Sequence, residues 1–260
     1  MSAARATLGE TALTTTTLAG SSLFGSVRGP VVAPGEFAFP GGVGYEALHL
    51  DRLVGQLPRT DFLLFLPTAL YLEPHPARGS VLPAGKLWLH ASFTGNGDPR
   101  AAPPPGFAGE AEALNPALPL SELVWGTKTV TPGRRRVLDH VPYTEYVATV
   151  DLERALAAAS GKTAPALRAA IQDQIAALRS SRGAGARTIQ IRAWVDGPGH
   201  VTRLQTSPPG ARLGTATTML GNFGVKVPRS VPAASEVLPV RSATPRGTSP
   251  WTIGNGSQSS

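Results

Sequence analysis

The sequence predicts an α+β fold in which an antiparallel β-sheet carries a pair of helices across one face. Short alternating segments separated by turn residues predict the sheet, because 29 glycines and 25 prolines favour many turns. A helical apolar pattern lies between strand-like segments within residues 125–237, and it predicts helices that cross the sheet. A sheet covered in this way forms a covered pocket, which is the main functional feature that the sequence predicts.

The first ninety residues predict a β meander. Its alternating or apolar segments are separated by turn residues and lie at 11–18, 23–32, 36–39, 45–50, 62–66, 69–72 and 87–93. Alternation within 45–50 places Glu46, Leu48 and Leu50 on one face of that strand. Pro67 separates two of the segments, which is typical of a bend or an edge position.

Two segments of low complexity interrupt or follow the strands. Residues 94–114 contain Gly-Asn-Gly-Asp-Pro and Pro-Pro-Pro-Gly, so we expect a flexible excursion without regular structure. Residues 239–260 predict a disordered tail despite Trp251. We therefore expect a single domain over residues 1–238, with the excursion inside it and the tail after it.

The helical pair is the clearest local pattern. A strand over 143–150 leads into Asp151, which suits the N-cap of a helix that ends near Gly161. Thr163 is placed to cap a second helix, which Gly183 ends. The second helix carries one apolar stripe, formed by Leu167, Ile171, Ile175 and Leu178. The stripe either packs against one face of the sheet as ordinary core or forms the lid of a cavity. Both descriptions apply if the packed helix leaves a gap above the sheet.

Strands flank the helical pair on both sides. The chain returns as a strand over 189–195, turns at 196–199 and continues over 200–206. An earlier strand is expected around 124–130, with Trp125 near its start. Arg134, Arg135 and Arg136 fall between two of the predicted strands, where a solvated loop is expected. Attraction of this run to anionic lipid headgroups is the functional alternative.

Composition excludes several classes of protein. The net charge is +7, but the 20 Arg and 4 Lys are scattered apart from that one run, which argues against nucleic-acid binding. The chain has no Cys, so it forms neither a disulfide nor a zinc–thiolate site. The most apolar run, residues 62–66, is too short to span a bilayer, and residues 1–18 lack the apolar core of a signal peptide.

Residues with reaction chemistry are sparse. No phosphate-binding loop, dinucleotide fingerprint, HExxH pair or GxSxG elbow occurs. No two His residues have the spacing of a helical metal site, and Glu145 and Asp151 are explained as strand and cap positions. We therefore expect no enzymatic activity, no cofactor and no metal site. The alternative class is a hydrolase whose catalytic Ser, His and Asp lie far apart in the sequence.

Four stretches resemble actinobacterial envelope lipoproteins. They are ALYL at 69–72 with LPAGKLWL at 82–89, PYTEYVATVDL at 142–152, IRAWVD at 191–196 with Gly199 and VTRL at 201–204, and NFGVKV at 222–227 with Pro228. These motifs resemble the LppX/LprG-like group of the LolA/LolB superfamily and cover residues 69–237. The chain lacks the signal peptide and the lipobox cysteine of that group.

The resemblance implies a specific architecture and cargo. It implies a LolA/LppX-like half-barrel, in which a curved antiparallel sheet has a helical pair over its concave face and encloses a hydrophobic cavity. It also implies an extracytoplasmic location in the cell envelope, with the full-length form membrane-anchored. The implied partner is a lipid or a lipidated glycan, with contact to a membrane surface and with no protein partner specified. It carries over no catalytic residue.

We therefore expect a non-catalytic lipid carrier or chaperone that holds acyl chains in its cavity. The large apolar residues of the predicted strands and helices are the candidates for its lining, namely Leu64, Leu66, Trp88, Val147, Leu156, Ile171, Ile175, Trp194 and Phe223. The same residues also suit an ordinary core.

The alternative is a structural or sensory envelope module with a filled core that binds a protein partner. An interior void of a few hundred Å³ would favour the carrier, and a filled interior would favour the module. A Trp in place of Ile171 is expected to block ligand uptake if the carrier hypothesis holds.

Overall fold

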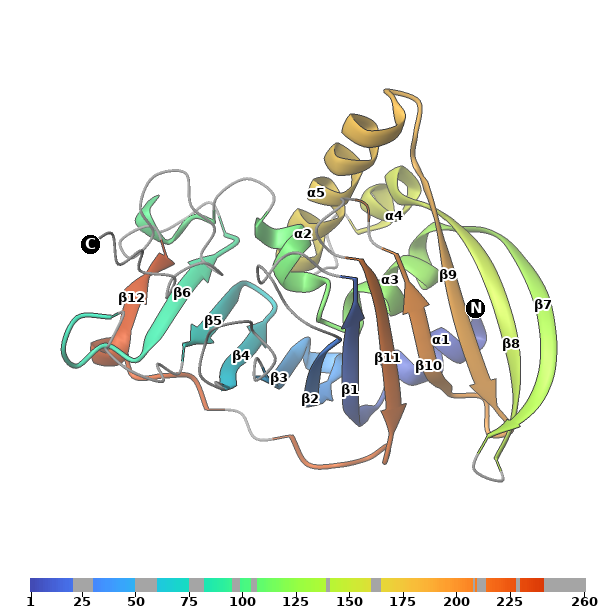
Figure 1. Cartoon of the computed structure of the whole chain (residues 1–260), viewed down its shortest axis with the longest axis horizontal. Helices are drawn as coiled ribbons and strands as arrows, with labels where there is room; N and C mark the ends of the chain where they lie inside the picture. Colours follow the sequence, from blue (N-terminus) through green and yellow to red (C-terminus); the bar gives the residue numbers. More distant parts are fainter. Residues whose placement is uncertain are drawn as a thin grey trace.

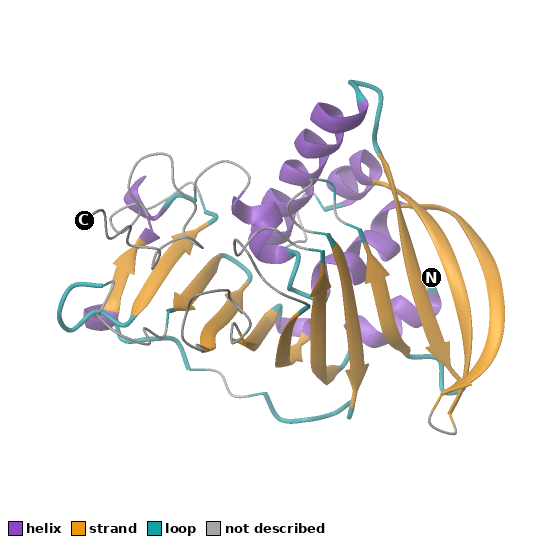
Figure 2. Cartoon of the chain, viewed as in Figure 1, coloured by secondary structure: helices purple, strands orange, loops and turns teal. Residues whose placement is uncertain are grey.

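A single twelve-stranded sheet dominates the computed structural model, with the helices gathered against one face (Figures 1 and 2). The structure describes residues 1–20, 30–49, 60–74, 82–94, 99–103, 107–138, 141–159, 165–207, 209, 214–227 and 230–240. The strands are β1 (Thr11–Ala19), β2 (Val31–Ala38), β3 (Val43–His49), β4 (Thr60–Leu66), β5 (Ala69–Glu73), β6 (Trp88–Ser92), β7 (Thr127–Leu138), β8 (Val141–Asp151), β9 (Thr188–Asp196), β10 (Val201–Thr206), β11 (Thr215–Gly221) and β12 (Val237–Pro239). The helices are α1 (Ser2–Leu8), α2 (Phe107–Glu112), α3 (Ala117–Gly126), α4 (Leu152–Ala158) and α5 (Pro165–Arg182).

Two halves of the chain meet in the middle of the sheet. The strand order is β12-β6-β5-β4-β3-β2-β1-β11-β10-β9-β8-β7, so the β1–β6 meander joins the later strands through the β1–β11 pair. Every pair is antiparallel except β12 with β6. The sheet does not close, and β7 and β12 are its edges. The predicted fold class, a curved open antiparallel sheet with helices over its concave face, is confirmed.

Alternation along the strands directs one face of the sheet toward the helices. In β1 the buried residues are Ala12, Thr14, Thr16 and Leu18, and in β9 they include Ile189, Ile191 and Ala193. The predicted alternation of β3 is confirmed, because Glu46 and Leu48 are buried while Tyr45 and Ala47 are only half-buried. Leu50 lies outside the described residues.

The predicted helical pair is confirmed as α4 and α5. The Asp151 carboxylate caps α4 by accepting hydrogen bonds from the backbone N–H groups of Glu153 and Arg154, both at 3.1 Å. The four stripe residues of α5 are all buried in the main core. The stripe therefore packs as core. Thr163 and Gly161 lie outside the described residues.

The β1–β6 half is filled by large side chains. The Phe37 ring lies 5.6 Å from that of Phe65 and 5.9 Å from that of Phe39, measured between centroids. Gly44 makes room for this cluster, because a Cβ built there would lie 2.0 Å from a carbon of the Phe37 ring. Since Phe37 and Phe65 are almost fully buried, this half has a close-packed interior.

The expectation of an irregular excursion over 94–114 was wrong for its second half. Residues 107–112 form α2, which packs against α5, and the Gly109 N–H donates a hydrogen bond to the Asp173 carboxylate at 3.0 Å. The buried Phe107, Ala108 and Ala111 anchor the helix in the core. Small residues beside a Pro-rich stretch masked this helix in the sequence.

Residues 117–126 form α3, so the strand expected around 124–130 was wrong at its start and begins only at Thr127, as β7. This helix is apolar on nearly all sides and is buried among other elements, so its sequence lacks the one-sided periodicity of a surface helix. The Asn115 side chain accepts a hydrogen bond from the Ala117 N–H at 2.9 Å, which marks the start of the helix. Trp125 packs partly buried against the core from α3.

Two further boundaries differ from expectation. Arg134, Arg135 and Arg136 lie within strand β7 rather than in a loop, because β7 is longer than the apolar pattern suggested. At the other end of the chain, Pro239 belongs to β12 and Val240 is buried, so ordered structure continues past the start of the predicted tail. Residues 241–260 lie outside the described residues. In the part of the chain that the structure describes, no helix has both the length and the apolar character of a membrane span.

Candidate functional site

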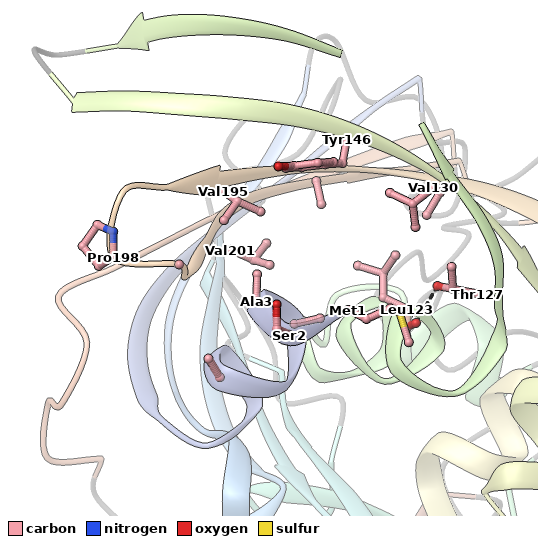
Figure 3. Close-up of a pocket in the computed structure, with 15 residues that line it drawn as sticks. Met1, Ser2, Ala3, Leu123, Thr127, Val130, Tyr146, Val195, Pro198 and Val201 are labelled. Atoms are coloured by element: carbon pink, nitrogen blue, oxygen red, sulfur yellow. Dashed lines mark hydrogen bonds between the residues drawn. The ribbon is translucent and has the colours of Figure 1, made fainter. Parts of the chain in front are cut away.

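A cavity of about 670 Å³ lies between α1, the end of α3 and the concave face of β7–β10 (Figure 3). Its volume falls within the range of roughly 300–1,000 Å³ that is typical of small-molecule sites. The residues that line it are Met1, Ser2, Ala3, Ala4, Ala6, Leu123, Thr127, Val130, Tyr146, Ala148, Ala193, Val195, Pro198, Gly199 and Val201. Most of these side chains are apolar, and none carries a carboxylate.

Small side chains leave this space open. Ala148 on β8 and Ala193 on β9 point from the sheet toward α1, which presents its own alanines, Ala3 and Ala4. Alanines on both sides of the gap cannot reach across it as the phenylalanines do in the other half. The void is therefore a consequence of side-chain size on opposing faces.

Helix α1 is fixed in place as a wall of the cavity. Thr7 is fully buried, and its hydroxyl accepts a hydrogen bond from the Val201 N–H on β10 at 2.8 Å. The same hydroxyl donates to the Ala3 carbonyl oxygen at 3.0 Å. One side chain thus holds α1 directly against β10 at the edge of the cavity.

The turn from α3 into β7 forms a second wall beside α1. The Thr127 hydroxyl donates to the Leu123 carbonyl oxygen at 2.5 Å, which holds both lining residues together (Figure 3). Gly126 permits close packing against β8, because a Cβ built there would lie 2.6 Å from the Asp151 carbonyl oxygen. The cavity therefore has fixed walls on both helical sides.

A second hollow of about 580 Å³ lies along β7–β9. It shares Tyr146 and Val195 with the cavity and is further lined by Arg135, Arg136, Val137, Pro142, Tyr143, Thr144, Asp196 and Gly197. We call this hollow the arginine groove. It differs from the cavity in offering charged and polar side chains.

The structure does not bring the nine sequence-predicted lining residues together, and none of them lines the cavity. Val147 and Trp194 lie on the convex face, one residue out of phase with Ala148 and Ala193. Trp194 instead packs under the Arg203 guanidinium, 4.6 Å from the ring centroid.

The other candidates divide between the convex face and the core. Register through Tyr71 and His90 puts Leu64, Leu66 and Trp88 on the convex side of β4–β6. Ile171 and Ile175 are buried core residues, against which Leu156 and Phe223 pack partly buried. The Phe223 ring also stacks on His200, with the centroids 4.5 Å apart.

Two corrections follow for the predicted cavity. Its helical walls are α1 and α3 rather than the predicted pair α4 and α5. A Trp at Ile171 would overpack a fully buried core position, so that substitution does not test ligand uptake. The sequence feature that could have located the cavity is the pair of alanines, Ala148 and Ala193, at inward-facing positions of β8 and β9. The large apolar residues did not locate it.

Buried carboxyl groups lie between the sheet and the helices. Burial raises the pKa of Glu112 on α2 and of Glu122 on α3 to about 8, and it raises that of Glu46 on β3 well above its usual range. Glu46 accepts a hydrogen bond from Thr16 at 3.2 Å, and Glu112 accepts one from the Asn115 amide at 2.6 Å. A pKa of about 8 keeps Glu112 and Glu122 mostly protonated at neutral pH, so they act as structural groups. Within the described residues, no three His, Asp or Glu side chains are grouped as a metal site.

Comparison with solved structures finds proteins that are similar to this chain at low sequence identity. No family model and no curated protein matches the chain. LprF from Mycobacterium bovis shares 15% identity over 89% of this chain and 94% of its own, with a TM-score of 0.43. The Mycobacterium tuberculosis lipoprotein LppX shares 11% identity over 86% and 91%, also with a TM-score of 0.43.

A LolA superfamily protein from Nitrosomonas europaea shares 7% identity over 86% of this chain and 87% of its own, with a TM-score of 0.28.

Proposed function

We propose that this protein is a non-catalytic binding protein that holds the acyl chain of a lipid or a lipidated glycan in the cavity between α1 and β7–β10. The observation that carries the proposal is the cavity itself, about 670 Å³ in volume and lined mainly by apolar side chains. Its site of action is the cell envelope, as the sequence resemblance implies.

Binding is driven by the transfer of methylene groups from water into the cavity. Each buried methylene contributes about 0.8 kcal/mol, so several are enough for stable but reversible binding. Because Thr7 and Thr127 already fix the two helical walls, little ordering opposes entry of the chain. Uptake and release then require no chemistry from the protein.

The experiment is ligand uptake by two Trp variants on the same sheet. Val195 points into the cavity (Figure 3). By register, Val147 lies on the convex face of the neighbouring strand. We expect Val195→Trp to reduce uptake of a fluorescent fatty acid at least tenfold, and Val147→Trp to leave it unchanged. Native mass spectrometry with organic extraction identifies any lipid that co-purifies with the wild-type protein.

The competing function is a structural or sensory envelope module that has a filled core and binds a protein partner. Equal uptake by wild type and Val195→Trp would contradict binding in this cavity. A wild-type protein that carries no lipid and takes up no fatty acid would favour the module instead.

A further inference from the structure

The cavity and the arginine groove follow one another along the same two strands. On β8, Ala148 lines only the cavity, Tyr146 lines both hollows, and Thr144 lines only the groove. On β9, Ala193 lines only the cavity and Val195 lines both hollows. A side chain that borders two separate hollows lies between them. Tyr146 and Val195 therefore mark the end of the cavity on the side of the groove.

Strand register makes these two side chains neighbours. Tyr146 pairs with Ala193 and Thr144 pairs with Val195, so Tyr146 and Val195 lie diagonally across β8 and β9 on the inward face. Figure 3 shows both on the sheet side of the cavity, opposite α1. We call Tyr146 and Val195 the end wall.

Tyr146 is the large residue in an inward row of small ones. The inward positions on either side of it along β8 are Ala148 and Thr144, and it lies opposite Ala193 on β9. The alanines leave the cavity open, so the Tyr146 ring is the first bulky group along this row. The ring therefore obstructs an acyl chain that runs along β8 from Ala148 towards Thr144.

The cavity has room for one long acyl chain. A methylene group takes up about as much space as a water molecule in the liquid, roughly 30 Å³, so a cavity of about 670 Å³ holds on the order of 20 such groups. Two chains of 16 carbons would need roughly 960 Å³. The length of chain that can be buried therefore depends on where the cavity stops.

We propose that Tyr146 sets the length of the acyl chain, because its ring closes a cavity for a single chain at the end wall. This inference rests on the proposed function and names a specificity-determining residue of the same site. Methylene groups buried before the ring add to the affinity. Methylene groups beyond it stay in water or must displace the ring, and they add none.

The test is a profile of affinity against chain length. Saturated fatty acids of 12 to 22 carbons displace the fluorescent fatty acid cis-parinaric acid from the protein, with each acid kept below its micelle concentration. For the wild-type protein, affinity is expected to rise about fourfold for each added methylene. The rise should stop at about 18 carbons, where the chain fills the cavity.

Variants of Tyr146 locate this limit. Tyr146→Ala removes the ring and is expected to move the limit upward by roughly two to four carbons. Tyr146→Leu is a milder truncation that should move it by less, and it provides the same test if the alanine variant does not fold. Tyr146→Phe keeps the ring and should keep the wild-type limit.

Tyr143→Ala is the matched control. Tyr143 is the same residue type on the same strand, but it lies in the outward phase and lines the groove without lining the cavity. The control variant is expected to keep the wild-type profile.

An unchanged limit in folded Tyr146→Ala or Tyr146→Leu protein would overturn the assignment while leaving the cavity function intact. So would a variant that changes the rate of uptake equally at all chain lengths, which would make the ring a gate. An equal shift in Tyr146→Phe would assign the effect to the hydroxyl and would also overturn it. Absence of wild-type binding at every chain length would overturn the proposed function together with this inference.

Discussion

The two halves of the sheet share one architecture, but one half has a filled concave face and the other has an open one. In the β1–β6 half, Phe37, Phe39 and Phe65 meet in a close-packed cluster on the concave face. In the β7–β10 half, Ala148 and Ala193 occupy the inward positions and leave a cavity of about 670 Å³. Strand phase decides which residues point inward, but side-chain volume decides whether the interior is core or binding site.

This difference also separates stability from function. The filled half is expected to supply packing energy, because cores lose stability whenever volume is removed. The open half forgoes part of that energy in order to keep space for a ligand. Substitutions in the two halves should therefore affect different measurements.

The largest effect on stability is expected from Phe37→Ala. The side chain is 1% exposed and packs against two other rings, so its removal leaves a closed cavity. The free energy of unfolding should fall by about 3–5 kcal/mol. Urea denaturation measures it. The matched variant in the open half is Val201→Ala, which enlarges an existing void and should lose only about 1–2 kcal/mol. Equal losses would contradict the distinction between the halves.

The second effect is a dependence of stability on pH. The pKa of Glu112 and of Glu122 is raised to about 8 in the folded protein, against an ordinary value near 4.3 in the unfolded chain. Between these values the folded state holds more protons, so the free energy of unfolding is highest at low pH and falls as pH rises toward about 8. Each group contributes a slope of up to about 1.4 kcal/mol per pH unit.

Glu112→Gln is the control for this slope, because an amide imitates the protonated acid and does not titrate. Urea denaturation across this pH range should show a shallower slope for the variant. Uptake of monopalmitoylglycerol should not follow the slope, since no carboxylate lines the cavity. Stability that stays constant or rises over the range would contradict the assignment of these carboxyls as buried and neutral.

The smallest effect is expected from Asp151→Ala. The substitution removes the two capping hydrogen bonds at the start of α4, which packs against the cavity-lining helix α3. Loss of such a cap costs about 1 kcal/mol, seen as a lower denaturation midpoint. Asp151→Asn retains the cap and should recover most of the loss, and a variant with no cost would show that tertiary contacts alone hold α4.

Much of the fold could be predicted from local sequence patterns. Alternation predicted β3 and β9, and a capping Asp151 followed by the stripe through Ile171 predicted α4 and α5. The pattern failed for α3, because a helix buried on nearly all sides loses its periodicity. It also failed for α1 and α2, which are short and rich in small residues.

The binding site was harder to predict because the sequence search favoured large apolar residues. Trp194 and Val147 are conspicuous in the sequence, yet they lie on the convex face, while their neighbours Ala193 and Ala148 line the cavity. A cavity is defined by what small residues leave empty. That emptiness depends on α1 opposite the sheet, and no local pattern reports that contact.

The most direct measurement is a crystal structure of the protein with a brominated fatty acid. The bromine anomalous signal marks where an acyl chain is bound. The account predicts a peak between α1 and β9, within the cavity lined by Ala3, Leu123 and Val195. A peak on the convex face near Trp194, or none in a crystal grown with saturating ligand, would contradict it.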